Sequence, residues 1–362
     1  LTVAVMFPNG ITLQTWLDQA LEKYALLKVV DEAPKRYVLH TIALLSDVSP
    51  KTSSLPEVLK PEHISGKWDA AVRNIQTACE LVDEHCGANI ASGSDRYLVY
   101  SPLISILAYI VEHYPFTDSG KERKQMDVQK LRAWYFGSGI SNQYNEGTDA
   151  KQQRDKTDLL NWFVAPSFEQ SPPSWLAEVH SNFQSTKSNA IGKAMISMLN
   201  LLNPTDLYAD NKALNSGGVA TWDLHHLFPK AAMRRVVMAD RKLKDPKAAD
   251  KILRDELRID SVLNQTWMLA TTNRSIIQDR MPSEYLKEVM SKYGAGANAR
   301  VKLESMLHNH AIGPKALDAL LADDYLKFIE ARKEAFIDHF KTTGHVRNIV
   351  TRVEDGDDEA SE

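Results

Sequence analysis

Four polar residues in the C-terminal half have the types and spacing that metal-assisted hydrolysis requires. His225 and His226 are adjacent, Asn264 follows in a second apolar segment, and Asn273 lies nine residues further on. Adjacent residues of a strand point to opposite faces, so one histidine can hold an ion while its neighbour faces a substrate. A neutral imidazole can take a proton from water, and asparagine offers a neutral oxygen to a hard cation. The pattern predicts a general base beside a divalent ion that neutralises charge on a phosphodiester.

The residues around these four indicate two short strands. The segment 221–229 (TWDLHHLFP) is short, aromatic and apolar and ends at a proline. The segment 261–273 (SVLNQTWMLATTN) is rich in Val, Thr and Trp. Both patterns are typical of β-strands. The two histidines would then lie at the end of the first strand, and Asn273 would lie where a helix opens after the second.

The arrangement resembles the HNH, or ββα-metal, nuclease motif. The sequences DLHHLFPK and SVLNQTWMLATTNRSIIQDRMPSEYL are similar to the C-terminal nuclease region of GmrSD-type modification-dependent restriction enzymes, the broad group that includes SspE-like proteins. The close match covers residues 222–286, and the N-terminal half resembles those proteins only in its helical texture. The resemblance implies a hydrolase of restriction and antiviral defence, a metal-dependent endonuclease that nicks or cleaves phage or other foreign DNA.

The resemblance also implies a role for each of the four residues. His226 would be the general base, and Asn264 would serve catalysis by fixing the loop that orients the His226 imidazole. His225 and Asn273 would hold the divalent ion, with Mg²⁺ as the first choice. Many relatives have an acid where His225 stands. A histidine there would weaken Mg²⁺ binding and admit Mn²⁺, Ni²⁺ or Zn²⁺.

Charged residues near the motif extend the expected site. Asp223 and Asp279 are candidate further ligands or supports of the ligands. Basic side chains close to the motif are expected to contact phosphates. These are Lys230, Arg234, Arg235, Arg274 and Arg280.

The net charge of −4 conceals an uneven distribution. The segment 354–362 holds six acids and no base, so the rest of the chain is weakly positive. The segment 230–258 holds ten Lys or Arg against five Asp or Glu. A basic patch in a near-neutral body suits a phosphate backbone, and a solvated helix face accounts for the same charges equally well.

The rest of the chain shows helical periodicity, so the expected fold class is mainly α. We expect a helical, bundle-like domain over residues 1–165, a helical domain with an embedded ββα-metal unit over 166–341, and an acidic disordered tail over 342–362. Within these domains, 141–156 has the composition of a loop and 165–174 that of a linker. Helices are expected at 11–27, 68–86, 101–114, 128–140, 175–202, 282–293, 299–311 and 314–341.

The apolar run lengths, the N-terminal segment, the cysteines and two further histidines limit the possible locations and functions. No run of about 18 apolar residues is present, which argues against a membrane partner. The N-terminal LTVAVMFPNG is no signal peptide, and a cytoplasmic location is expected. Cys79 and Cys86 are expected to be reduced thiols. His308 and His310 do not share a helix face and are expected to be solvated or capping residues.

The chain has no Asp-Gly-Gln-Gln-Arg signature and no phosphate-binding loop. The N-terminal nucleotide-hydrolysing sensor domain of full-length relatives is therefore expected to be missing from this fragment. DNA is the expected partner, and the oligomeric state stays open. Two alternatives remain: an RNA-cleaving HNH nuclease, and a DNA-binding module with a degenerate nuclease site.

Overall fold

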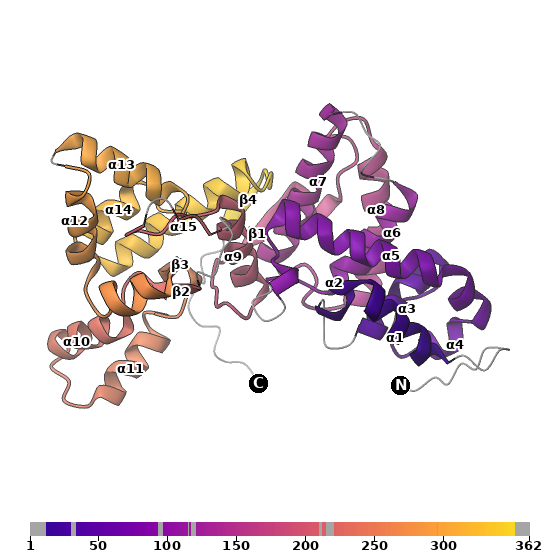
Figure 1. Ribbon diagram of the computed structural model, residues 1–362, viewed down its shortest axis with the longest axis horizontal. Coiled ribbons are helices and arrows are strands. Elements are labelled where there is room, and N and C mark those ends of the chain that lie inside the picture. The colour runs from indigo at the N-terminus through magenta and orange to yellow at the C-terminus, as the bar shows by residue number, and fades with distance from the viewer. Residues whose placement is uncertain are drawn as a thin grey trace, which may run out of the picture. The chain divides into compact units, whose positions relative to one another are not determined.

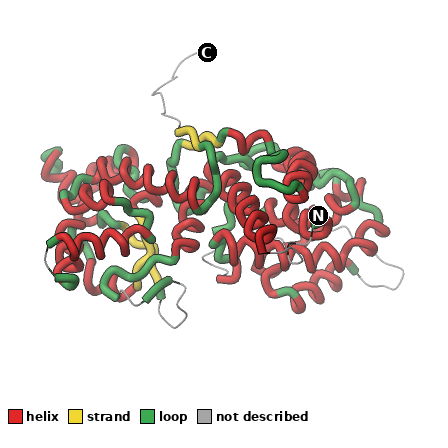
Figure 2. The backbone as a smooth tube through the Cα atoms, turned by 90° about the horizontal axis from the view of Figure 1, so that it is seen from above, coloured by secondary structure: helices red, strands yellow, loops and turns green. Residues whose placement is uncertain are grey.

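The computed structural model describes residues 12–29, 34–92, 97–114, 116, 121–209, 212–214, 221–294 and 296–351. In these ranges the chain is mainly helical with four short strands, which confirms the mainly α class (Figures 1 and 2). The acidic segment 354–362 lies outside the described residues. No helix within the described ranges is long and apolar enough to span a bilayer.

The chain divides into two compact units. Unit 1 comprises Leu1–Asn182 and Thr343–Glu362, and unit 2 comprises Phe183–Thr342. Unit 2 is therefore inserted into unit 1. Residues 166–182, which the sequence analysis assigned to the second domain, fall in unit 1.

Unit 1 is built from helices whose apolar stripes face a common core. In α5 (Pro61–Cys86) Cys79 and Cys86 are buried free thiols. The buried apolar residues follow a helical spacing and include Trp68, Ala71, Val72, Ile75, Ala78 and Val82. This helix ends at Gly87, whose φ of 69° suits a glycine cap. The other helices are α1 (Leu13–Lys23), α2 (Ala25–Val29), α3 (Pro34–Leu45), α4 (Leu55–Val58), α6 (Pro102–His113), α7 (Lys121–Ile140) and α8 (Thr148–Val164), with 3₁₀ turns at Ile90–Ser92 and Ser174–Ala177.

Helix α8 begins inside the segment expected to be a loop. The inner face of its first half is polar, because Gln152, Asp155 and Lys156 are all buried, whereas Leu159, Trp162 and Phe163 are buried in its second half. Asp155 accepts a hydrogen bond of 2.7 Å from the Tyr144 hydroxyl. Gln152 donates to the Pro102 carbonyl, and Lys156 donates to the Asp47 carboxylate. A helix whose buried side is hydrogen-bonded rather than apolar gives no hydrophobic periodicity, so the prediction of a loop over 148–156 was wrong.

A small parallel sheet joins two distant segments of unit 1. Strand β1 (Val179–Ser181) pairs with β4 (Ile349–Thr351), with Val179 opposite Ile349. β1 lies in the segment 175–202, for which the sequence leaves open a helix with a break midway, and only α9 (Ala190–Leu202) of that segment is α-helical. β4 lies in the expected tail, so residues 349–351 are a strand and not part of a disordered segment.

Unit 2 packs its remaining helices around a second sheet. The apolar cluster includes Phe228, whose ring centroid lies 5.3 Å from that of Tyr325 and 5.4 Å from that of Phe328. The expected long helix over 314–341 is interrupted at 322–324. The elements are α10 (Lys230–Asp240), α11 (Pro246–Asp255), α12 (Pro282–Ser291), α13 (Ala297–His308), α14 (Pro314–Leu321) and α15 (Tyr325–Thr342), with a 3₁₀ turn at Val262–Asn264 and a π-helical segment at Thr272–Ile277.

The second sheet positions the motif. Strand β2 (Trp222–His226) pairs antiparallel with β3 (Gln265–Leu269), so Trp222 lies opposite Leu269 and His226 lies opposite Gln265. The connection between them leaves and returns at the His226 end, and it contains α10 and α11, which pack side by side as a helical hairpin (Figure 1).

Candidate functional site

Asn264 ties together the two chain segments that meet at the His226 end of the sheet. Its Oδ1 accepts a hydrogen bond from the Phe228 backbone N–H at 2.9 Å, and its Nδ2 donates to the carbonyls of Phe228 (3.1 Å) and Ile259 (3.0 Å). Its own carbonyl accepts from the Leu227 N–H at 2.8 Å. The side chain is fully buried. Bonds of this kind fix the loop directly after His226, as a residue that orients the imidazole must do.

His226 is held by an acid that the sequence analysis did not identify. The ring Nε2 lies 3.0 Å from Asp260 Oδ1 and 3.2 Å from Gln265 Nε2. Lys230 Nζ contacts the same carboxylate at 2.7 Å from Oδ2. A carboxylate can only accept, so Nε2 carries the proton in the bond to Asp260, and the Gln265 amide nitrogen, itself a donor, makes no hydrogen bond to it. Nδ1 of the neutral ring then holds the lone pair, and it has no hydrogen-bond partner among the described residues.

Burial keeps the His226 ring neutral. Desolvation lowers the pKa of His226 below its usual value, and the Asp260 carboxylate opposes that shift without reversing it. A neutral imidazole with an unpaired nitrogen can accept a proton from water at neutral pH.

His225 is more deeply buried than its neighbour. Only 6% of its surface is exposed, and its Nε2 has no hydrogen-bond partner among the residues that the structure describes. Burial, together with the nearby His226 ring, lowers the pKa of His225 to about 4. A buried polar atom without a partner is rare in proteins, and its lone pair is suited to bind an ion.

Asn273 is oriented by Asp223. Its Nδ2 donates to Asp223 Oδ2 at 3.1 Å, so its Oδ1 is turned away from that carboxylate. Arg274 forms a bidentate pair with the same Asp223, with both N···O distances at 3.0 Å. Asp223 and His225 are two residues apart on β2 and so point to the same face of the strand.

An ion held at this place would have few protein ligands. The His225 Nε2 and the Asn273 Oδ1 are the available donor atoms, and Asp223 holds the asparagine amide in place. Across the described ranges, no three His, Cys, Asp or Glu side chains gather as a metal site. An ion here would complete its coordination with water and substrate oxygens, as Mg²⁺ commonly does.

Every basic residue expected at the phosphate already has a carboxylate partner. The pairs are Lys230–Asp260 (2.6 Å), Arg234–Asp250 (2.6 Å), Arg235–Asp279 (2.6 Å), Arg274–Asp223 (3.0 Å) and Arg280–Glu288 (2.7 Å). Asp279 therefore pairs with the exposed Arg235. Within the described ranges it has no hydrogen bond or ion pair with His225 or Asn273.

Of the two histidines expected to be solvated or capping residues, His308 is exposed and His310 is not. His310 is fully buried, with its Nδ1 2.8 Å from Thr266 Oγ1 and its Nε2 2.7 Å from the Thr205 carbonyl. The prediction of a solvated or capping role for His310 was therefore wrong. The His308 ring centroid lies 4.9 Å from that of His339.

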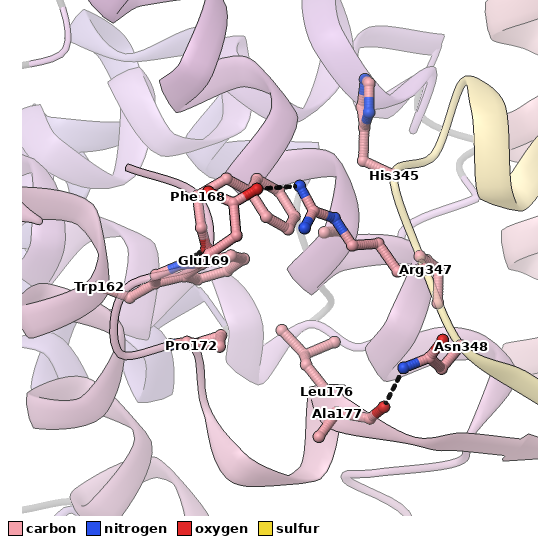
Figure 3. A pocket seen from close by; sticks show the side chains of 11 residues that line it. Trp162, Phe168, Glu169, Pro172, Leu176, Ala177, His345, Arg347 and Asn348 are labelled. Atoms are coloured by element: carbon pink, nitrogen blue, oxygen red, sulfur yellow. Dashed lines mark hydrogen bonds and ion pairs between the residues drawn. The ribbon is translucent and has the colours of Figure 1, made fainter. Parts of the chain in front are cut away.

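A separate hollow of about 200 Å³ lies in unit 1 (Figure 3). Its polar groups are paired with each other: Arg347 contacts Glu169 at 2.7 Å and lies over the Phe168 ring, and Asn348 donates to the Ala177 carbonyl at 2.8 Å. None of the residues expected to do chemistry lines this hollow.

No protein-family model matches the chain. The chain is similar to an uncharacterized protein of Methanocaldococcus jannaschii, with 23% identity over 263 residues. The match covers 66% of this chain and 40% of that protein, so the chain spans well under half the length of this relative.

Proposed function

We propose that this chain is the nuclease part of a metal-dependent HNH endonuclease that nicks or cleaves DNA. The observation that carries the proposal is the difference between two adjacent imidazoles at the end of β2. His226 is oriented by Asp260 and His225 is buried, and within the described ranges neither the His226 Nδ1 nor the His225 Nε2 has a hydrogen-bond partner. The sequence resemblance to GmrSD-type enzymes supports the same assignment.

In this proposal the side chains divide the work of hydrolysis. His226 Nδ1 takes the proton of a water molecule while the water oxygen bonds to phosphorus and the bond to the leaving oxygen breaks. Asp260 keeps the imidazole in the required tautomer and stabilises its positive charge. His225 and Asn273 would hold the divalent ion, and Mg²⁺ there would neutralise charge on the scissile phosphate and the leaving oxygen.

The biological setting follows from the same resemblance. Such a nuclease would act in the cytoplasm on phage or other foreign DNA, together with a nucleotide-hydrolysing sensor domain. One ββα-metal site cleaves one strand at a time, so a monomer is expected to nick.

The test is cleavage of supercoiled plasmid by the purified chain with Mg²⁺ or Mn²⁺. Wild type should convert the plasmid to open circles, and excess EDTA or His226→Ala should abolish that conversion. His180→Ala, which alters a partly exposed histidine of unit 1, is the matched control. Cleavage that survives EDTA would contradict the proposal.

A parallel reaction with RNA separates the alternatives. Cleavage of RNA alone would replace the DNA assignment. Binding of DNA without cleavage of either nucleic acid would indicate a degenerate site.

Asn273→Ala should retain activity only at raised metal concentration, because it removes one ligand and leaves the base in place.

A further inference from the structure

The α10–α11 hairpin carries cations that differ from the paired arginines described above. Four of its lysines are exposed, and none has a carboxylate within ion-pair distance in the part of the chain that the structure describes. Two lie in the turn between the helices and two lie on α11, one helical turn apart. They are Lys242, Lys244, Lys247 and Lys251.

The acids at this tip are already engaged. Asp240 lies 3.5 Å from Arg241, and Asp250 lies 2.6 Å from Arg234. Asp245 caps α11 by accepting a backbone N–H of its first turn at 2.9 Å. Among the described residues none of these acids forms an ion pair with the four lysines, which are exposed to solvent.

The hairpin is continuous with the candidate site. The β2–β3 connection that contains the hairpin is closed next to His226, where Leu227 N–H donates to the Asn264 carbonyl at 2.8 Å. Helix α10 has 11 residues and therefore extends about 16 Å from that point. Phosphates of one DNA strand rise about 3.4 Å per nucleotide along the duplex axis, so this reach corresponds to about five base pairs.

We infer that the tip of the hairpin, formed by these four lysines, holds the phosphate backbone of duplex DNA about five base pairs from the bond cleaved at His226. The inference rests on the proposed function and names the surface by which that site grips its substrate. Lysine ammonium groups are mobile point charges that suit backbone contacts without sequence preference.

The arginines nearest the site are less suited to this first contact. Arg234 and Arg235 would have to give up ion pairs with Asp250 and Asp279, both at 2.6 Å, before they could bind a phosphate. A lysine without such a partner releases only bound salt ions. The salt dependence of DNA binding should therefore arise mainly from the hairpin tip.

The experiment compares two double variants with the same change in charge. Lys244→Gln/Lys247→Gln alters the tip, and Lys287→Gln/Lys341→Gln alters two exposed lysines elsewhere in unit 2. The affinity of the full chain for a fluorescent 30-base-pair duplex is measured in EDTA from about 50 to 200 mM salt. The tip variant should lose about two units of the log–log salt slope, and the control about none.

The outcomes separate this inference from the proposed nuclease. Equal slopes for the two variants, or no binding by wild type, would overturn the role of the tip even if wild type nicks plasmid. A reduced slope for the tip variant alone would support the inference even if no plasmid is nicked, in which case the nuclease proposal fails. Stronger binding of duplex RNA than of duplex DNA would show that the occupant is wrong.

Discussion

Two histidines of unit 2, His226 and His310, both donate a hydrogen bond from Nε2. They differ in whether Nδ1 has a hydrogen-bond partner among the described residues. In the buried network, formed by His310, Thr266, Thr205 and Arg332, the Nε2 of the histidine donates to a carbonyl and its Nδ1 accepts from a threonine hydroxyl. In the half-exposed network, formed by His226, Asp260, Lys230 and Gln265, the Nε2 donates to a carboxylate and no described residue occupies Nδ1.

Exposure follows the same division. The His310 and Arg332 side chains have no exposed surface, whereas His226 is 23% exposed and Asp260 is 49% exposed. A ring with both nitrogens occupied and no access to water can only support the fold. A ring with one nitrogen left over and partial access to water can exchange a proton. The comparison thus assigns His310 to the stability of the fold and leaves His226 as the histidine to which the proposed function gives a chemical role.

The largest expected effect tests this separation directly. His226→Ala should reduce plasmid nicking about 10³-fold, close to 4 kcal/mol, because the proton acceptor is lost. Its free energy of unfolding should change by less than about 1 kcal/mol. His310→Ala should show the reverse pattern, with reduced stability and retained nicking below its unfolding transition. Equal losses of activity in both variants would remove the distinction.

Next in size is the loss of the buried guanidinium. Arg332 donates to the carbonyls of Leu263 (2.7 Å) and His310 (2.9 Å). Burial lowers the pKa of Arg332 to about 9, so it stays charged at neutral pH. Arg332→Met should cost about 3 kcal/mol of unfolding free energy in urea titrations, because both acceptors lose a charged donor. Lys333→Met, on the neighbouring position, is the control, and an equal cost there would contradict the prediction.

The buried network should also make stability depend on pH. Burial lowers the pKa of His310 to about 4, below the 6.5 of an exposed histidine. Its contribution is complete above pH 6.5 and is lost as the pH falls towards 4, because the unfolded chain binds the proton first. The loss approaches about 3 kcal/mol at the acid end of that window. Urea titrations of wild type and His310→Gln should differ in this slope, whereas exposed His113→Gln should match wild type.

The smallest effect concerns the carboxylate of the half-exposed network. Asp260→Asn keeps an oxygen for Nε2 and removes the charge that raises the pKa of His226. Nicking should fall about tenfold, or roughly 1.4 kcal/mol. The acid limb of the pH profile should move to lower pH, because the ring loses a group that favours its protonated form. An unchanged limb would assign Asp260 a purely structural role.

The sequence predicted these features unevenly, and the physical reason differs in each case. Local composition identified β2, β3 and the residues His225, His226, Asn264 and Asn273, since short apolar segments rarely carry such polar groups. Asp260 was missed because a single acid in a charged segment has no pattern of its own. The arginine pairs depend on partners 8 to 51 residues away, which only the folded chain brings together.

The buried polar positions were missed for a related reason. The polar residue Asp155 of α8 and the ring of His310 can be buried because each has a buried hydrogen-bond partner, Tyr144 and Thr266 respectively. Hydrophobic periodicity measures apolar burial and does not register a polar group whose partners come from elsewhere in the chain.

The insertion of unit 2 has a consequence for the chain entropy of unit 1. Phe183 and Phe340, near the two ends of unit 2, have ring centroids 6.1 Å apart, so the folded insert brings its own ends together. The pairing of β1 with β4 requires those ends to be close. Were the insert a flexible loop of 160 residues, closing it would cost roughly 4–5 kcal/mol. Folding of unit 2 removes most of that cost, and unit 2 thereby stabilises a sheet to which it contributes no strand.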